Sequence, residues 1–318
     1  MTNPVPPPAS SQLRLRTADP APAPSEATLQ WAREAVGPGS VIVSLRLMSV
    51  YSTVLHALDV QDARGVTHRL SLRRFHHAER LRTDPWYLPS NEATVLGLLG
   101  STDVPAPRLV AADTGPTMCD MPTLLTTRLP GSPPSAPDSP ACLQAFAKLL
   151  TNIHQVELPV VKALPPYRPY YDPILDGQRL PPVWSRMPGL WRRVFEILAA
   201  GPPQAPMGFI HRDFHPGQTL WNDDWLVGVV DWTTGCLGPR GIDLARMRLN
   251  LAGRYGADAA DHFLSLYRQT APSDNYHPYW DLLDAADGLI DVPEPTTMRA
   301  FQDFARFEDW VARVAAQF

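Results

Sequence analysis

The sequence predicts an α+β protein of two lobes, an N-terminal lobe built on an antiparallel sheet and a mainly helical C-terminal lobe. β-prone runs separated by short polar breaks fill residues 40–129, whereas apolar residues recur at helical spacing after residue 140. Between them, five prolines occur within residues 130–140, which indicates a boundary. We therefore expect an N-terminal lobe over 25–128 and a C-terminal lobe over 129–318.

The N-terminal lobe is expected to begin with a helix that follows a disordered tail. Residues 1–24 hold seven prolines and almost no periodic apolar residues, so they cannot bury enough surface to offset the entropy of ordering. Ser25 can cap a helix whose apolar residues Leu29, Ala32 and Val36 share one face. The Gly-Pro-Gly sequence after Val36 ends this helix.

Three β-prone runs come next and predict an antiparallel meander, with a hairpin turn over 62–65. The runs cover residues 40–47, 53–60 and 67–75. Residues 89–100 then predict a helix that crosses the sheet, with Ser90 or Asn91 as its N-cap. The other predicted elements are strands over 107–113 and 123–129 and helices over 143–153 and 298–318.

The composition of the chain excludes several classes of function. A formal net charge of −4 gives no general attraction to nucleic acid, and the chain holds no apolar run that could span a membrane. The three cysteines, Cys119, Cys142 and Cys236, fit neither an even disulfide framework nor a metal-ligand spacing. We therefore expect a soluble cytoplasmic protein with free thiols and with neither nucleic acid nor a membrane as partner. The sequence predicts no oligomeric state.

Polar side chains crowd a predicted apolar hairpin within the helical lobe, whose short strands cover 209–213 and 225–231 and flank a Pro-Gly turn. The stretch runs from IHRDFHPGQTLW at position 210 to VVDW at position 229. The order His-Arg-Asp, then an amide side chain, then a second Asp is that of a phosphoryl-transfer site. The three residues concerned are Asp213, Gln218 and Asp231.

This order has a chemical reason. A hydroxyl that attacks phosphorus must lose a proton, so a carboxylate free of metal must stand beside the acceptor, and Asp213 is the candidate base. Mg²⁺ prefers hard oxygen ligands, which Gln218 and Asp231 can supply together. His211 is expected to support the backbone of the loop.

The stretch resembles the aminoglycoside phosphotransferase and choline kinase-like family, relatives of the protein kinases, and the resemblance covers residues 28–318. FIHRDFHPGQTLW resembles the catalytic loop of this family, VVDW its metal-binding aspartate, and GPRGIDLARM the segment that follows. The resemblance implies a two-lobed protein-kinase-like fold, ATP or GTP and Mg²⁺ as cofactors, and transfer of the γ-phosphate to a hydroxyl of a small molecule. It also implies that Asp243 braces the core. His154 lies at the end of a helix that resembles the corresponding helix of the family, and it is expected to make structural hydrogen bonds.

The N-terminal lobe matches the family less closely. LSLRRF resembles the strand that normally ends in an ATP-binding lysine, but the two lysines of the chain, Lys148 and Lys162, lie far beyond it. Arg73 stands at the matching position, and Glu92 resembles its helix partner. Because alternate residues of a strand share a face, Arg73 can point at the nucleotide while Arg74 points away. A guanidinium keeps the charge of a lysine, but its larger planar group changes the pairing with Glu92.

Two further departures concern the metal and the phosphates. Gln218 stands where the family has Asn, on a stem one methylene longer, so the backbone must adjust for a metal to bind. No glycine occurs between Gly39 and Gly65, although a loop that covers phosphates normally uses glycine for close backbone approach. The candidate phosphate loop, Met48–Thr53, offers hydroxyls or amides from Ser49, Ser52 and Thr53.

Two other functions are compatible with these residues. A nucleotide-binding scaffold without turnover would show the same departures at the nucleotide and metal positions, although the retained Asp213 argues against it. A metal-dependent hydrolase could use His211, Asp213 and His215, which alternate as ligands on one strand face would. The Pro-Gly pair directly after them and the better fit of Asp231 to phosphoryl transfer make the hydrolase the weakest of the three.

The charge of the C-terminal region bears on the acceptor. Residues 270–318 hold nine acidic residues against three arginines, so negative helices are expected around the acceptor pocket. Carboxylates pair with ammonium groups, which favours an aminoglycoside-like substrate or another amine-bearing alcohol. A solvated acidic helix face explains the same pattern equally well.

Overall fold

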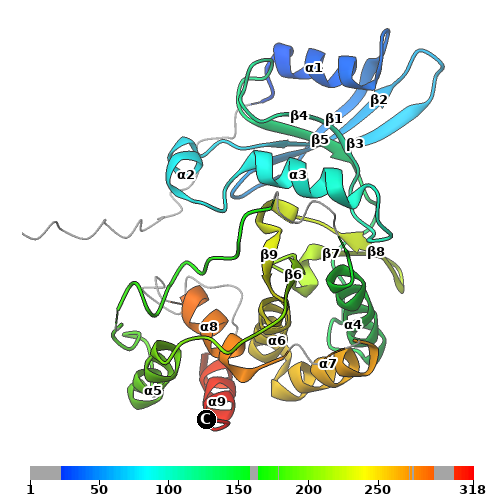
Figure 1. The fold of residues 1–318 in the computed structure, drawn as a ribbon. Coiled ribbons are helices and arrows are strands. Elements are labelled where there is room, and N and C mark those ends of the chain that lie inside the picture. Colours follow the sequence, from blue (N-terminus) through cyan, green and yellow to red (C-terminus); the bar gives the residue numbers. More distant parts are fainter. Residues whose placement is uncertain (1–22, 158–163, 178, 272, 274–275, 290–303) are drawn as a thin grey trace, which may run out of the picture.

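The computed structural model describes residues 23–157, 164–177, 179–271, 273, 276–289 and 304–318. A five-stranded sheet flanked by helices lies at one end of the molecule, and a mainly helical part lies at the other, with short strands between them (Figure 1). The predicted α+β fold class is confirmed, while the lobe limits of 25–128 and 129–318 stay a prediction. Residues 1–22 of the predicted tail and 298–303 of the last predicted helix lie outside the described residues.

The strands of the N-terminal sheet are β1 Val41–Val50, β2 Val54–Gln61, β3 Thr67–Arg74, β4 Leu109–Asp113 and β5 Thr123–Thr127. They lie in the order β1-β2-β3-β5-β4 with all neighbours antiparallel, so the predicted meander is confirmed. The Asp62 carboxylate accepts hydrogen bonds from the backbone N–H groups of Arg64 (2.9 Å) and Val66 (3.0 Å). These bonds close the predicted turn between β2 and β3.

Helices cover both faces of this sheet (Figure 1). α1, Glu26–Val36, packs Ala32 into the outer face and is capped by the Ser25 hydroxyl, as predicted. α3, Pro89–Leu99, lies on the opposite face, between the sheet and the helical lobe. A short helix that the sequence did not reveal, α2 Ala78–Thr83, has no buried residue and hence no apolar periodicity.

The start of α3 differs from the prediction. The helix begins at Pro89, and neither Ser90 nor Asn91 is its N-cap. Proline suits the first helical position because its missing N–H would have no partner there. The Asn91 side chain instead donates hydrogen bonds to the backbone carbonyls of Thr233 (2.8 Å) and Gly235 (3.0 Å). The predicted cap is therefore wrong, because Asn91 ties α3 to the helical lobe.

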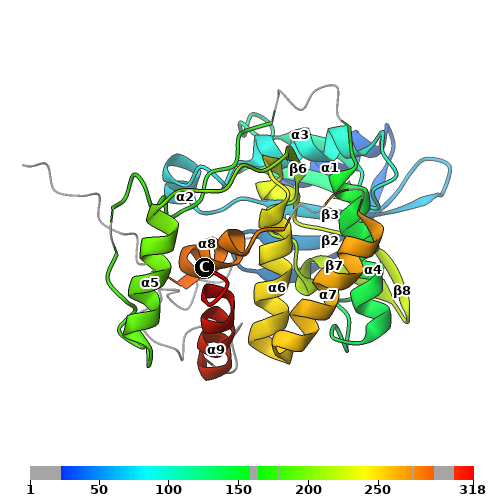
Figure 2. The ribbon, with the colours of Figure 1, turned by 60° about the horizontal axis from the view of Figure 1, so that its bottom comes forward.

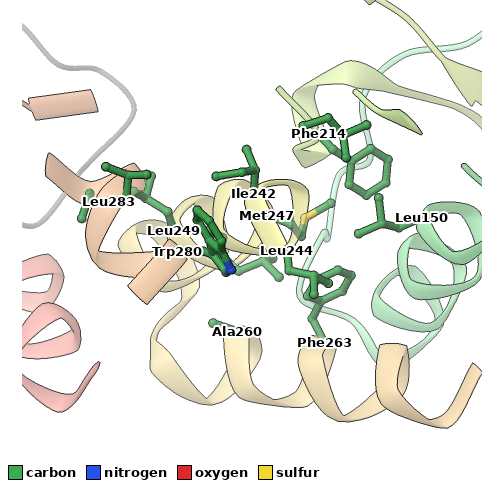
Figure 3. Packing of buried hydrophobic residues seen from close by; sticks show 14 of the residues in the cluster. Leu150, Phe214, Ile242, Leu244, Met247, Leu249, Ala260, Phe263, Trp280 and Leu283 are labelled. Atoms are coloured by element: carbon green, nitrogen blue, oxygen red, sulfur yellow. The ribbon is translucent and has the colours of Figure 1, made fainter. Parts of the chain in front are cut away.

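The helical lobe is arranged around one central helix, α6. Its helices are α4 Pro140–His154, α5 Pro188–Ala199, α6 Gly241–Tyr255, α7 Ala257–Thr270, α8 Pro278–Leu289 and α9 Phe304–Ala315. α6 packs against α7, α8 and α9, and α4 packs against α7 (Figure 2). Phe214, which follows Asp213, lies beside Leu150 of α4 over the buried side chains of α6 (Figure 3). This packing anchors the Asp213 loop on the core.

The short strands between the lobes pair differently from the prediction. They are β6 Met207–Ile210, β7 Thr219–Asn222, β8 Trp225–Val229 and β9 Cys236–Pro239. β6 pairs with β9 and β7 pairs with β8, so the predicted hairpin of 209–213 with 225–231 is wrong. Arg212 has a φ of 70°, and this left-handed backbone ends the strand before Asp213. Asp213 and Asp231 therefore both lie on loops.

Two further observations concern the chain as a whole. Cys119, Cys142 and Cys236 form no disulfide, so the prediction of free thiols is confirmed. Within the described ranges, no helix is both long and apolar enough to cross a bilayer.

Candidate active site

Two cavities meet beside the Asp213 loop. The larger, of about 540 Å³, is lined by residues of both lobes, and the smaller, of about 340 Å³, lies against α6. Pro133 and Gly217 line both, so the two cavities share a wall. Of the predicted site residues, the larger cavity is lined by Ser49, Ser52, Thr53, Arg73, Glu92, Gln218 and Asp231, and the smaller by Asp213.

Gln218 links the two predicted aspartates at this junction. Its side-chain nitrogen donates hydrogen bonds to Asp213 Oδ2 (3.1 Å) and Asp231 Oδ2 (3.5 Å). Asp213 lines the smaller cavity and Asp231 the larger one. The two carboxylates therefore approach one amide group from different cavities.

Arg73 of β3 joins the sheet, α3 and the loop after β8. One guanidinium nitrogen donates to Glu92 Oε1 (2.9 Å) and the other to Asp231 Oδ1 (2.7 Å), because the planar fork can hold two carboxylates at once. Burial tends to raise the pKa of Asp231, but the charge and hydrogen bond of Arg73 lower it to about 2. Burial raises the pKa of Glu92, and Arg73 opposes that rise. Asp231 is thus ionised at neutral pH.

The residues around Arg73 alternate between the two faces of β3. Ser71 lines the larger cavity together with Arg73. Arg74 is fully buried on the opposite face, where it pairs with Asp120. Only the first of the two adjacent arginines therefore reaches the cavity, as the period of a strand requires.

The end of β1 and the turn after it form part of the wall of the larger cavity. Of the candidate phosphate loop, residues 48–50 are the last residues of β1 and only residues 51–53 form the turn. Ser49, Ser52 and Thr53 all line the cavity there. The backbone N–H of Tyr51 donates to the Thr53 carbonyl (3.0 Å), and the Tyr87 hydroxyl donates to the Ser52 carbonyl. These bonds hold in place a turn that has no glycine.

Asp243, near the start of α6, supports the Asp213 loop from below. Its buried carboxylate accepts hydrogen bonds from the backbone N–H groups of His211 (2.9 Å) and Arg212 (2.7 Å). His154, at the end of α4, places Nε2 3.1 Å from the same carboxylate and Nδ1 2.8 Å from the Tyr267 hydroxyl. The left-handed backbone at Arg212 is thereby fixed by side chains from two helices.

His211 faces away from both cavities. Its ring is fully buried, with Nδ1 accepting from the backbone N–H of Asp213 (3.3 Å) and Nε2 3.0 Å from the Val230 carbonyl. Because both ring nitrogens have protein partners, His211 cannot share a metal with Asp213 and His215. In the described part of the chain, no three His, Cys, Asp or Glu side chains are placed to hold a metal. The described geometry therefore gives no support to the hydrolase alternative.

The charges around Asp213 favour its ionised form. Arg246 of α6 places Nε 3.5 Å from Oδ1, and His215 places Nε2 3.8 Å from Oδ2. Burial tends to raise the pKa of Asp213, but His215 and Arg246 outweigh burial and lower it, despite the opposing charge of Asp231. The side chain is 35% exposed, so it remains accessible from the smaller cavity.

Arg246 and its partner Asp284 were not predicted from the sequence. Arg246 is held from behind by Asp284 of α8, with 3.1 Å between the guanidinium and Oδ1. Burial raises the pKa of Asp284 to about 7, although Arg246 opposes the rise. Arg246, Asn250 and Arg254 recur every four residues along α6 and line the smaller cavity. Their spacing of four residues, which places them on one face of the helix, is a signal that could have revealed them.

The side chains at the junction belong to the types that bind magnesium. Asp231 supplies a carboxylate with a low pKa, and Gln218 lies beside it with its amide nitrogen toward that carboxylate, so the amide must rotate before its oxygen can share a metal with Asp231. Carboxylate and amide oxygens are hard ligands of the kind that Mg²⁺ prefers. Thr233, which donates to Asp231 Oδ1 (2.9 Å), and Arg73 orient this carboxylate.

The acidic residues of the C-terminal region do not surround the smaller cavity where the structure describes them. Asp281 pairs with Arg248 and Asp284 with Arg246, while Asp287 lies near Arg212. None of the described acids after residue 270 lines either cavity. For these residues the predicted negative surround is wrong, because the carboxylates neutralise buried arginines. The remaining acids, Asp274, Asp291, Glu294 and Asp303, lie outside the described residues.

Comparisons with known proteins identify the family of the chain. Residues 57–283 match the family model APH, the phosphotransferase enzyme family. A homoserine kinase of Rhodospirillum rubrum is 28% identical over 205 residues, which span 58% of this chain and 62% of that relative.

Solved structures extend the similarity over most of the chain. A Ralstonia eutropha protein classed with the aminoglycoside phosphotransferases matches with a TM-score of 0.64 and 14% identity, covering 92% of this chain and 98% of its own. An aminoglycoside phosphotransferase in a ternary complex with ADP and hygromycin B matches with a TM-score of 0.54 and 14% identity, covering 86% of this chain and 93% of its own. At such identities the structures establish the fold alone. The family match covers more than half of the sequence, so the chain belongs to the phosphotransferase enzyme family.

Proposed function

We propose that the chain is an ATP-dependent phosphotransferase that moves the γ-phosphate to a hydroxyl of a small molecule. The observation that carries this proposal is the junction at Gln218, where Asp213 and Asp231 approach one amide from two cavities that share a wall. A donor in the larger cavity and an acceptor in the smaller one would meet there. The reaction needs such an arrangement, because its two substrates must be aligned before transfer.

Asp213 is the general base of the proposed reaction. It accepts the proton of the acceptor hydroxyl while the hydroxyl oxygen forms a bond to the γ-phosphorus. The bond between that phosphorus and the oxygen bridging to the β-phosphate breaks, and ADP leaves with the electron pair. The low pKa of Asp213 keeps the carboxylate ionised before this step.

The larger cavity is proposed to hold the nucleotide. Leu55, Leu124 and Val230 offer apolar walls for a base, while Arg73 supplies a fixed positive charge for the phosphates. Gln218 and Asp231 would hold Mg²⁺, which neutralises phosphate charge when it is bound. The ADP in the solved ternary complex of a structural neighbour supports an adenine nucleotide as donor.

The acceptor is proposed to be a small amine-bearing alcohol. The homoserine kinase relative and the neighbour with bound hygromycin B both support a small-molecule acceptor with amino groups. The three free cysteines support a cytoplasmic location for this activity.

Removing the base tests the proposal. Asp213→Ala should lower phosphate transfer by about 100- to 10,000-fold, because the acceptor proton loses its destination. ATP affinity should stay within a few-fold of the unmodified protein, since Asp213 does not line the nucleotide cavity. Turnover is measured with Mg-ATP and a panel of aminoglycosides, macrolides and amino alcohols, with the exposed Asp224→Ala as matched control. Unchanged turnover in Asp213→Ala would remove Asp213 from the base role.

One observation favours a nucleotide-binding scaffold as the second candidate. Arg73 occupies Asp231 Oδ1, an oxygen that a metal would need, at 2.7 Å. A scaffold would bind ATP tightly and phosphorylate no compound of the panel, whereas the proposed enzyme transfers phosphate to at least one. The same experiment therefore separates the two functions.

A further inference from the structure

Arg212, the residue before the proposed base, has a buried guanidinium that faces aromatic rings. The guanidinium carbon lies 4.2 Å from the ring centroid of Trp86, 4.8 Å from that of Tyr170 and 5.7 Å from that of Tyr167. The residue is 4% exposed, and an oxygen of Asp287 lies 3.9 Å from the guanidinium. The faces of aromatic rings attract a cation, most strongly where water is excluded. The rings therefore stabilise a charge that burial alone would destabilise.

These rings come from both lobes. Trp86 lies between α2 and α3 of the N-terminal lobe, whereas the two tyrosines lie between α4 and α5. The carbonyl of Arg168 accepts hydrogen bonds from Trp86 Nε1 (3.1 Å) and from the Arg212 guanidinium (3.2 Å). Residues 164–177 run beneath α2 and α3 before the chain reaches α5 (Figure 1). Arg212 thus joins the loop of the base to chain segments of both lobes.

The ring-bearing segments are each fixed to their own lobe. Asp84, the residue after α2, accepts a hydrogen bond from the backbone N–H of Trp86 (2.9 Å). On the helical side, the backbone N–H of Tyr167 donates to the carbonyl of Leu237 in β9 (2.8 Å). A shift of one lobe against the other would therefore change the contacts at Arg212.

The backbone of Arg212 gives a second reason to assign a role to its side chain. Its φ of 70° lies in the left-handed region, where a residue with a β-carbon is strained and glycine is not. The backbone N–H donates to Asp243 Oδ1 (2.7 Å), a bond that glycine would make equally well. Such strain persists only where the surroundings hold the residue in place. The contacts of the guanidinium supply that hold.

We infer that Arg212 is a positioning residue: its guanidinium sets how the two lobes meet beside the base and so aligns a nucleotide in the larger cavity with Asp213. The inference deepens the proposed function and rests on it. Arg212 lines neither cavity, so it touches neither proposed substrate. Its effect is on alignment, and a misplacement of about 1 Å can lower the rate of a reaction about 100-fold.

Another contact between the lobes limits what the loss of Arg212 does. The Asn91 side chain binds the carbonyls of Thr233 and Gly235 and does not involve Arg212. Removal of the guanidinium therefore frees the orientation of the lobes and does not separate them.

Steady-state kinetics test the role in transfer. Arg212→Met keeps a long side chain without the charge, and it should lower kcat about 100-fold while KM for ATP and for the acceptor stays within a few-fold. Arg212→Lys keeps the charge and should recover most of the loss. Transfer is measured from Mg-ATP to the best acceptor among the aminoglycosides, macrolides and amino alcohols of the panel. The rate is expressed per nucleotide site counted by calorimetry, so unfolded protein does not enter it.

The matched control is Arg179→Met. The Arg179 guanidinium carbon lies 4.2 Å from the ring centroid of Tyr171, and neither residue lines either cavity. This variant removes the same kind of contact within the helical lobe and should change neither kcat nor KM.

A distance measurement tests the lobe contact without any reaction. Spin labels at the exposed positions Glu79→Cys on α2 and Arg192→Cys on α5 report the separation of the lobes by electron paramagnetic resonance. Cys142→Ser removes the partly exposed thiol of the chain, whose other thiols are buried. With Mg²⁺ and AMP-PNP present, we expect a broader distance distribution in Arg212→Met and an unchanged one in Arg179→Met.

A second pair of variants keeps the test open if Arg212→Met does not fold. Trp86→Leu removes the ring and should lower kcat, whereas Trp86→Phe keeps a ring and should stay closer to the unmodified protein. In the double variant Arg212→Met/Trp86→Leu, the loss should be much smaller than the product of the two single losses, because both changes remove one contact.

The failures are distinguishable. A kcat of Arg212→Met within a few-fold of the unmodified protein, or an equal loss in Arg179→Met, overturns the positioning role and leaves the proposed function intact. An unchanged distance distribution in Arg212→Met overturns the assigned lobe contact. ATP binding without transfer to any compound of the panel overturns the proposed function and the role in alignment with it.

Discussion

The two cavities at the Gln218 junction differ in what lines them. The larger combines apolar side chains of both lobes with a network of Arg73, Glu92 and Asp231 that spans the lobes. The smaller is lined by four prolines and by the polar α6 residues Arg246, Asn250 and Arg254. The larger cavity therefore suits a ligand with a flat apolar part and a charged end, and the smaller cavity suits a small polar ligand.

The difference separates donor chemistry from acceptor chemistry. The shared wall contains Pro133 and Gly217 but no charged residue. The pKa of Asp231 is lowered mainly by Arg73 of the sheet, whereas the pKa of Asp213 is lowered by His215 and Arg246 of the helical lobe. We therefore expect a substitution in the larger cavity to change the kinetic parameters for ATP and leave those for the acceptor unchanged, and a substitution in the smaller cavity to do the reverse.

The largest change in a Michaelis constant is expected on the donor side at Arg73. Arg73→Met should raise KM for ATP by about 10- to 100-fold, because it removes a charged hydrogen-bond donor from the phosphates and from Asp231. KM for the acceptor should change little. Arg73→Lys, which keeps the charge, should stay closer to the unmodified protein.

The matched control is Arg69→Met, since Arg69 is an exposed arginine of the same strand. It should leave KM for ATP unchanged. Steady-state kinetics with ATP and acceptor varied in turn measures all three variants. A rise in acceptor KM as large as that for ATP in Arg73→Met would break the separation of the two cavities.

A smaller effect is expected on the acceptor side, in the pH dependence. Asp213 acts in its ionised form and its pKa is lowered, so turnover falls only when the pH drops through that low pKa. Arg246→Gln removes a positive charge that favours ionisation, so the pKa rises and the acid limb of the kcat profile moves to higher pH. KM for ATP should not respond.

Arg246→Lys keeps the charge and should leave the acid limb close to its original position. Because Arg246→Gln leaves Asp284 buried without its arginine, the double variant Arg246→Gln/Asp284→Asn keeps the test open if the single variant does not fold. An acid limb that stays in place, or moves to lower pH, in a folded variant would contradict the role of Arg246.

The Asp213 loop and the donor side are where the sequence was most informative. Asp213, Gln218 and Asp231 lie within nineteen residues whose order is set by the reaction, so a local pattern sufficed to select them. The period of a strand alone distinguishes Arg73, which faces the cavity, from Arg74, which faces away from it. The structure places these residues at one junction, and their catalytic roles stay a prediction until they are measured.

The acceptor side was harder to predict because its parts are distant in sequence. Arg246 becomes important only when α8 brings Asp284 behind it. A count of charges suggested negative helices, but it cannot show that Asp281 and Asp284 are each paired with an arginine of α6. The pairing of β6 with β9 was missed for the same reason, since a chain reversal at Arg212 is not visible in a pattern of apolar residues.

The separation of Asp213 from Asp231 is tested most directly by nucleotide binding to two isosteric variants. Calorimetry with Mg²⁺ and a non-hydrolysable ATP analogue compares the unmodified protein with Asp213→Asn and Asp231→Asn. The account predicts that Asp231→Asn weakens binding by about tenfold or more, through loss of a charged metal ligand, while Asp213→Asn stays within a few-fold. Equal loss of affinity in both variants, or a greater loss in Asp213→Asn, would contradict it.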